Sequence, residues 1–317
     1  MTARSGADAV SGRGVGLALV AIVLWGTLAR LGVRLSSMPP FLLVGAALTI
    51  AGLASTPLWR QWRVPLRVLL LGVYGLFGFH FFLFTALRLA PPLQANLVNY
   101  LWPLLMVLLA PLVVPAARLT RRHVFGGVLG FAGALVAITD GHPPLDRLPA
   151  TDAPVASHAA LGFAAALLSA LIWATYSLYG QRLRQRGIAY PTAAIGLFCL
   201  VSGLLALGCH RVLEAPYQLS GADVVPLAAL AIGPMGIAFF LWDAALARGD
   251  ARRIGTLAYL TPLISTLLLG LDDPARFGWP IALAIGLVVG GALVGSRGVE
   301  ARGPAARPGG GSTDRGP

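Results

Sequence analysis

The chain has 317 residues, of which 57% are apolar and only 11% are charged, and its mean hydropathy is +0.77. Soluble globular domains carry about 25% charged residues, so this composition excludes that class and indicates a membrane protein. The net charge of +12 lies between apolar runs rather than on one surface, and we therefore expect no nucleic-acid partner.

Apolar runs of about 20 residues recur along the chain, and each is long enough to cross a hydrocarbon core of about 30 Å. The first run follows Arg4 and Arg13 as in a signal peptide, but it continues past Arg30 to Arg34, so we expect a retained span. In chain order the sequence predicts ten transmembrane helices, at 14–34, 39–58, 66–88, 92–116, 122–139, 158–180, 190–209, 223–246, 252–271 and 277–296.

Two segments lack an apolar run. The segment 140–157 is rich in proline and is predicted to be a periplasmic linker between two five-helix repeats, residues 1–139 and 158–296. Residues 297–317 are rich in glycine, proline and arginine, and we expect them to form a disordered cytoplasmic tail.

All 24 basic residues are arginine, and their density alternates from one predicted loop to the next. With a cytoplasmic N-terminus, the inside segments carry 18 arginines and the outside segments carry 6. Cytoplasmic loops of membrane proteins are enriched in basic residues. The pattern predicts that both termini are cytoplasmic and that the protein spans a bacterial inner membrane several times.

Five motifs recur in the same order in both halves, at offsets of 148 to 159 residues. The matched pairs include Trp25 with Trp173, Pro40 with Pro191, Phe81 with Phe239, Tyr100 with Tyr259, Pro103 with Pro262 and Gly133 with Gly291. Because each half has an odd number of helices, the second half must enter the membrane from the opposite side. We therefore predict an all-α inverted repeat around a central cavity, an architecture typical of transporters.

Several of these motifs resemble the EamA-type branch of the drug/metabolite transporter superfamily. They are Trp25-Gly26, the string Asn99-Tyr100-Leu101-Trp102-Pro103, and the stretch from Phe240 to Pro262 with Trp242, Gly249 and Tyr259. Within that branch they are similar to the YddG-type aromatic amino acid exporters. The resemblance implies export of aromatic and other neutral amino acids through a cavity that opens alternately to each side. Small multidrug-resistance pumps of the same superfamily use a glutamate in the first helix, and residues 14–34 contain no acid.

Nine side chains are predicted to line the substrate pathway: Trp25, His80, Asn99, Tyr100, Trp102, Trp173, Tyr176, Trp242 and Tyr259. The alternative for the aromatic residues is ordinary helix packing or an interfacial belt. Pro103 and Pro262 occupy matched positions inside the fourth and ninth helices, where proline removes a backbone hydrogen bond. They predict either hinges in broken helices or simple packing kinks.

Three polar residues lie within the predicted helices. His80 is near the middle of the third, and its imidazole faces either a water-filled pathway or a backbone carbonyl. The amide of Asn99 suits either a zwitterionic substrate or an interhelical hydrogen bond. Asp243 lies near Arg248 and Arg252 in the sequence, and we expect an ion pair with them at the membrane surface.

The remaining motifs predict no chemistry. The chain has no HExxH pair, no serine-nucleophile motif and no pair of buried aspartates, so we expect a transporter and neither an enzyme nor a metal or cofactor site. The expected partners are a small-molecule substrate and the lipid bilayer, and a monomer is compatible with the sequence. Export of cationic drugs or of other metabolites is the alternative function. Helix packing or a dimer contact is expected at five glycines: Gly126, Gly130, Gly133, Gly286 and Gly290.

Overall fold

The computed structural model describes residues 2–114, 117–139, 153–271 and 278–296, and over these residues the chain is helical. The first half contains α1 (Thr2–Gly26), α2 (Leu28–Arg34), α3 (Pro40–Ala54), η1 (Thr56–Gln61), α4 (Leu66–Val73), η2 (Tyr74–Gly78), α5 (Phe79–Leu89), α6 (Pro92–Asn99), α7 (Trp102–Val113) and α8 (Arg121–Thr139). The second contains α9 (Ala153–Gln185), α10 (Ala194–Leu213), α11 (Gly221–Ile232), η4 (Gly233–Ile237), α12 (Ala238–Arg248), α13 (Ala251–Leu257), α14 (Leu260–Gly270) and α15 (Trp279–Ser296).

Seven helical stretches of the described chain are long and apolar enough to cross a membrane: Gly12–Arg34, Leu66–Leu89, Pro92–Val113, Arg121–Thr139, His158–Gln185, Ala194–Leu213 and Gly221–Arg248. Two shorter apolar helices, Pro40–Ala54 and Trp279–Gly295, lie between or after them. The protein is therefore a multi-pass membrane protein, as its composition indicates.

Several helix boundaries differ from the predicted ones, most of all at the first helix and at α9. The first helix begins at Thr2 rather than at residue 14, and α9 extends from Ala153 to Gln185 rather than from 158 to 180. The start of α9 therefore lies inside the segment predicted as a linker. The rest of that linker, 140–152, and the predicted tail, 297–317, lie outside the described residues.

Proline explains two breaks in the predicted fourth and ninth helices. A proline nitrogen cannot donate to the carbonyl four residues earlier, which is that of Asn99 for Pro103 and that of Ala258 for Pro262. The first break separates α6 from α7 and the second separates α13 from α14. Each proline thus stands in the first turn of a new helix, where its missing N–H costs nothing.

Two other predicted helices are continuous but contain one π-helical turn each. η2 lies between α4 and α5, and η4 lies between α11 and α12. Both turns are rich in glycine, and Pro234 in η4 also lacks a backbone donor. A π turn inserts one extra residue into the helix, and the sequence pattern did not predict either turn.

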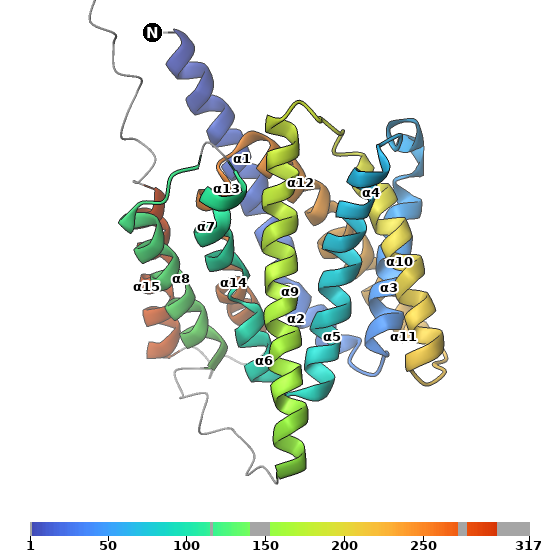
Figure 1. The fold of residues 1–317 in the computed structure, drawn as a ribbon. Coiled ribbons are helices and arrows are strands. Elements are labelled where there is room, and N and C mark those ends of the chain that lie inside the picture. Colours follow the sequence, from blue (N-terminus) through green and yellow to red (C-terminus); the bar gives the residue numbers. More distant parts are fainter. Residues whose placement is uncertain (1, 115–116, 140–152, 272–277, 297–317) are drawn as a thin grey trace, which may run out of the picture.

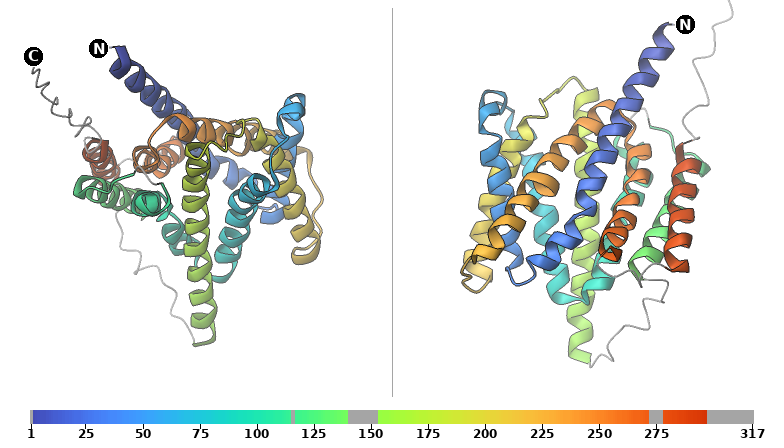
Figure 2. Two further views of the ribbon diagram at one scale, coloured as in Figure 1. Left: turned by 45° about the horizontal axis from the view of Figure 1, so that its top comes forward. Right: turned by 180° about the vertical axis from the view of Figure 1, so that it is seen from behind.

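Four long pairings organise the bundle: α8 packs along α15, α3 along α10, α5 along α9 and α1 along α12. In Figure 1 the pair α8–α15 lies at one side and α3–α10 at the other, with α9 crossing the front between them. The view from behind in Figure 2 shows α1 and α12 crossing the opposite face. The arrangement brings α1, α7, α9 and α12 together in the main hydrophobic core.

Glycines allow close backbone approach in two of these pairings. A Cβ on Gly126 would lie 2.6 Å from the Gly291 carbonyl oxygen, and one on Gly45 would lie 2.8 Å from the Leu207 nitrogen. Such contacts are typical of helix interfaces in membranes. Gly286 and Gly290 differ, because within the described chain nothing lies within 4 Å of a Cβ built on either residue.

Candidate functional site

Four tryptophans from four helices meet in the main core, and we name them the tryptophan cluster: Trp25 of α1, Trp102 of α7, Trp173 of α9 and Trp242 of α12. The Trp25 ring lies 6.4 Å from that of Trp102, 5.8 Å from that of Trp173 and 5.0 Å from that of Trp242, measured between centroids. The four side chains are 1–7% exposed. Their mostly edge-to-face arrangement suits the quadrupoles of the rings.

Breaks in the helices position two of these side chains. Trp25 is the second-last residue of α1, just before the interruption at Thr27, and Trp102 is the first residue of α7. The Trp25 indole N–H donates to the carbonyl of Pro234 in η4 at 3.1 Å, so a π turn of the second half holds a ring of the first. The Pro234 carbonyl lies in an irregular turn, and it accepts its hydrogen bond from a side chain, as irregular backbone inside a membrane protein requires.

The indole donors of the cluster fall into two groups. Trp242 donates to the hydroxyl of Ser177 at 3.2 Å, and Trp25 is held as described. Within the described part of the chain, Trp102 and Trp173 donate their indole N–H to no protein acceptor. Two polar donors in an aromatic setting are thus available to a ligand, which is the common composition of a small-molecule site.

Further aromatic rings extend the cluster toward α5. Phe79 and Phe239 lie 5.1 and 5.6 Å from Trp173, and Tyr176 lies 5.5 Å from it. A Cβ on Gly75 in η2 would come within 2.3 Å of the Tyr176 ring, so the π turn accommodates this tyrosine. Sequence reasoning did not single out Phe79 or Phe239. The phenylalanine repeat that pairs Phe81 with Phe239 marked this region without indicating which ring faces inward.

His80 and Asn99 are both buried, and the ring of His80 lies beside those of Phe79 and Phe239. The His80 Nδ1 lies 2.6 Å from the Leu76 carbonyl oxygen, and its ring lies 6.3 Å from that of Phe239. Asn99 Oδ1 is 3.1 Å from the Ser169 hydroxyl, a contact that links α6 to α9. His80 therefore bonds a backbone carbonyl and Asn99 makes an interhelical hydrogen bond, which are the structural roles that the sequence offered as alternatives to substrate contact.

Four other predicted site residues lie outside the tryptophan cluster. Among the described residues Tyr100 makes no ring contact with it and is half-buried at the end of α6. Tyr259 is fully buried in a second core with Phe131 and Leu263, packed between α8 and α15. Pro103 and Pro262 lie at the helix breaks already described.

The predicted partners of Asp243 are wrong. Asp243 pairs with Arg184 of α9, whose Nη2 lies 2.7 Å from its carboxylate, and also accepts hydrogen bonds from Tyr190 and Thr192 at 3.2 and 2.8 Å. Arg248 instead donates to the Ala244 carbonyl. The reason is geometric, because α12 turns Asp243 toward α9 and Arg248 away from it.

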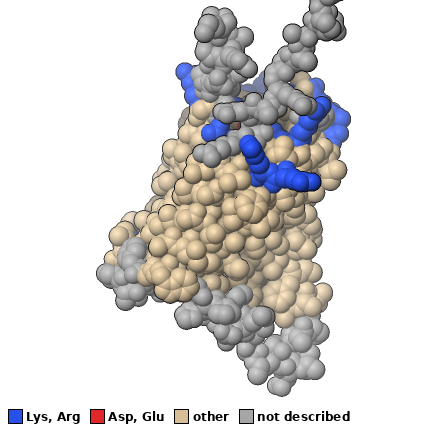
Figure 3. Space-filling model, turned by 90° about the vertical axis from the view of Figure 1, so that its left-hand side faces the viewer, with Lys and Arg blue, Asp and Glu red and all other residues tan. Residues whose placement is uncertain are grey.

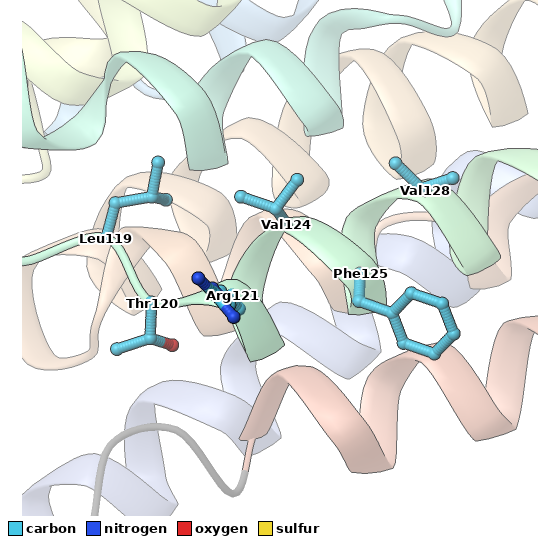
Figure 4. A pocket seen from close by; sticks show the side chains of 6 residues that line it. All are labelled: Leu119, Thr120, Arg121, Val124, Phe125 and Val128. Atoms are coloured by element: carbon cyan, nitrogen blue, oxygen red, sulfur yellow. The ribbon is translucent and has the colours of Figure 1, made fainter.

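Arginines gather at one end of the face that Figure 3 shows. Figure 3 shows arginines at the end where α1 begins and an uncharged face below them. An open hollow of about 640 Å³ at the start of α8 is lined by Leu119, Thr120, Arg121, Val124, Phe125 and Val128 (Figure 4). This hollow shares no residue with the tryptophan cluster. Its exposed Phe125 lies near Arg121, and an aromatic and a basic residue together are typical of a helix end at the membrane surface.

The family follows from a match that covers most of the chain. The model of the EamA-like transporter family matches this chain twice, at residues 12–139 and 160–297. The chain belongs to the EamA-like transporter family. As an EamA-family protein it is a membrane transporter of small solutes and not an enzyme.

Individual relatives of this EamA-family protein are similar over nearly their whole length. The aromatic amino acid exporter YddG of Ancylobacter novellus is 39% identical over 285 residues, which cover 88% of this chain and 95% of the relative. A probable amino-acid metabolite efflux pump of Salmonella typhimurium is 28% identical, covering 78% and 83%. A solved crystal structure, 38% identical, matches with a TM-score of 0.80 and covers 90% of this chain and 98% of the other.

Proposed function

We propose that this protein exports aromatic and other neutral amino acids from the cytoplasm by alternating access, through a pathway at the tryptophan cluster. The observation that carries the proposal is the meeting of four buried tryptophans from four helices, two of them with unused indole donors. Aromatic walls attract the ring of an aromatic solute. The names of the relatives, an aromatic amino acid exporter and an amino-acid metabolite efflux pump, point to the same solutes.

The proposed mechanism needs ten spans arranged as two inverted five-helix repeats, residues 1–139 and 158–296. The packing pattern supports this. Exchanging the halves converts the α5–α9 pairing into the α12–α1 pairing and returns α3–α10 and α8–α15 to themselves. The π turns η2 and η4 exchange as well, as do the breaks before Pro103 and Pro262. The two separate family matches also fall on the two halves.

The proposed orientation places both termini in the cytoplasm and the protein in the bacterial inner membrane. The gathering of arginines at the end where α1 begins supports it, since basic residues remain on the cytoplasmic side. The proposed pathway residues are Trp25, His80, Asn99, Tyr100, Trp102, Trp173, Tyr176, Trp242 and Tyr259, with hinges at Pro103 and Pro262. Tyr100 and Tyr259 would reach it only in another conformation.

Flux into proteoliposomes tests the proposal. The purified protein should carry labelled tryptophan and phenylalanine, and threonine more slowly, well above the leak of protein-free liposomes. A cationic dye serves as the competing solute, because the faces of tryptophan rings also attract cations. Transport of the dye without transport of any amino acid would replace the proposed substrate class, and leak-level flux for every solute would refute the proposal.

A further inference from the structure

A second, smaller hollow lies at the arginine-rich end of the molecule, between α7, α9 and the turn that joins α12 to α13. Its volume is about 210 Å³, and its polar lining consists of Gln181, Gln185, Asp250 and Arg252. At about 30 Å³ per water molecule, it has room for about seven waters or one small organic solute. Gly249 on its rim packs against Gly14 in the middle of α1, where a Cβ would lie 2.9 Å from the Gly249 nitrogen.

Asp250 and Arg252 present a negative and a positive group side by side in this hollow. Asp250 Oδ1 accepts from the Arg252 backbone nitrogen at 2.8 Å and from Nε at 3.0 Å, and the Arg252 Nη2 also contacts the carboxylate. Burial opposes ionisation of Asp250, but the hydrogen bonds and charge of Arg252 outweigh it and hold the pKa of this carboxyl below its usual value. Asp250 is therefore ionised at neutral pH and stands beside the guanidinium of Arg252.

These polar groups keep unused hydrogen-bonding capacity. A guanidinium has five N–H donors, and Arg252 uses one each from Nε and Nη2 on Asp250 and one from Nη1 on the Arg118 carbonyl. Gln181, which lines the hollow, donates through Nε2 to the Gly249 carbonyl at 2.8 Å, and no described residue donates to its Oε1. Two N–H groups of Arg252 remain for a ligand, and the Asp250 carboxylate, whose side chain is 26% exposed, accepts from three N–H groups of Arg252 and keeps about one of its four acceptor positions.

The equivalent positions of the first repeat lack these groups. In the repeat alignment, offsets of 159 and 148 residues match Asp250 and Arg252 with Pro91 and Leu93, and Gln181 with Val33. An inverted repeat builds both mouths from equivalent positions. The Asp250–Arg252 pair, present in one repeat and absent from the equivalent positions of the other, is therefore a feature that the symmetry does not require.

We propose that this hollow is a loading site, in which Asp250 takes the ammonium and Arg252 the carboxylate of an amino acid entering from the arginine-rich side. The inference rests on the proposed function and adds a recognition element for the zwitterion. It complements the tryptophan cluster, which contacts no acid or arginine in the contacts described and suits the side chain of the solute. Charge-assisted hydrogen bonds of this kind discriminate strongly against a solute that lacks one charge.

Three solutes with the same ring test the loading site: tryptophan, tryptamine without the carboxylate, and indole-3-propionate without the ammonium. In proteoliposomes, Arg252→Gln should raise the half-saturating concentration for tryptophan about tenfold and leave that for tryptamine unchanged. Asp250→Asn keeps the helix cap of α13. It should also raise the half-saturating concentration for tryptophan about tenfold, and it should leave that for indole-3-propionate unchanged. Arg253→Gln is the matched control, because it removes the same charge one residue away and does not line the hollow.

A labelling measurement keeps the inference testable if Arg252→Gln folds poorly. In a Cys199→Ser and Cys209→Ser background, Gln185→Cys places a thiol on the exposed rim of the hollow. Tryptophan should slow its reaction with a membrane-impermeant maleimide at least threefold, and Asp250→Asn should abolish that protection.

The outcomes separate the two proposals. The loading site alone is refuted if the wild-type protein transports tryptophan, Arg252→Gln and Asp250→Asn leave its half-saturating concentration unchanged, and tryptophan does not slow the labelling of Gln185→Cys. Wild-type protein that carries none of the three solutes refutes the proposed function and the loading site with it.

Discussion

Arg184 Nη2 lies 2.7 Å from both carboxylate oxygens of Asp243, and the guanidinium carbon lies 4.1 Å from the centre of the Tyr190 ring. The pair joins α9 to α12 at the arginine-rich end, and its side chains are only 15% and 5% exposed. Removing one partner of a buried pair leaves the other charge uncompensated, which costs far more than an exposed pair contributes.

Asp243→Asn should therefore lower the free energy of unfolding by about 3 kcal/mol, because Arg184 would lose its counter-charge. Thermal unfolding in detergent micelles measures the loss. Arg248→Gln is the control, because Arg248 is exposed and only contacts a carbonyl of its own helix; its effect should stay below about 0.5 kcal/mol. Equal midpoints for the two variants would contradict the assigned pairing.

Substituting glycines should separate packed from open helix faces. Gly45→Ala should lower the unfolding temperature, since its Cβ would lie 2.8 Å from the Leu207 backbone nitrogen of α10. Gly286→Ala should leave it unchanged or raise it, because nothing described lies within 4 Å and alanine is favoured over glycine in a helix by about 0.5–1 kcal/mol. A destabilising Gly286→Ala would indicate that another surface packs on α15.

Trp173→Ala should reduce tryptophan flux per folded protein about tenfold or more, because Trp173 contacts Trp25, Trp102, Tyr176, Phe79 and Phe239. Truncating so large a buried side chain also costs about 3–5 kcal/mol of stability. Trp173→Phe, which keeps a ring, is therefore measured beside it. Trp279→Ala provides the control, since that tryptophan is 68% exposed on α15.

Tyr100→Ala should also reduce flux if the break between α6 and α7 forms part of the pathway. Because this tyrosine is half-buried and makes no ring contact with the tryptophan cluster among the described residues, the folded yield should stay near that of the wild type. Flux at the wild-type rate would remove Tyr100 from the pathway.

Trp25→Phe keeps a ring in the tryptophan cluster but removes the N–H that bonds the Pro234 carbonyl at 3.1 Å. Leaving a buried carbonyl unpaired costs about 1–3 kcal/mol, and we expect a stability loss in that range. Hydrogen exchange of the amides in η4 and the first turn of α12 should rise in parallel. Trp59→Phe, at a tryptophan that is 55% exposed, should change neither quantity.

Much of the fold could be predicted because lipid imposes a simple pattern. Apolar length located the helical segments, and the matched Pro103 and Pro262 marked the two breaks. Trp25, Trp102, Trp173 and Trp242 were all among the predicted pathway residues, and the four do meet. The partner of Asp243 could not be predicted, because sequence distance favoured Arg248 while the fold brings α9 alongside.

Other features escaped prediction for equally physical reasons. A π turn differs from an α turn by one unmatched residue, which leaves no trace in an almost wholly apolar pattern. Tyr259 matched Tyr100 in the alignment, but its ring packs against Gly130 of α8, and neither ring contacts the tryptophan cluster. Sequence symmetry fixes which positions correspond and does not fix which neighbours each side chain meets.

The two π turns also give α5 and α12 a means of rotation. Each turn holds one residue more than the regular helix needs, and a residue occupies about 100° of helical rotation. If η2 or η4 tightened to α geometry, the segment after it would revolve by that angle while keeping its backbone hydrogen bonds. Phe79 and Phe239, which each follow a π turn by one or two positions, would then swing away from Trp173. Rings could leave the centre of the molecule by a screw motion of two helices, without any helix unfolding.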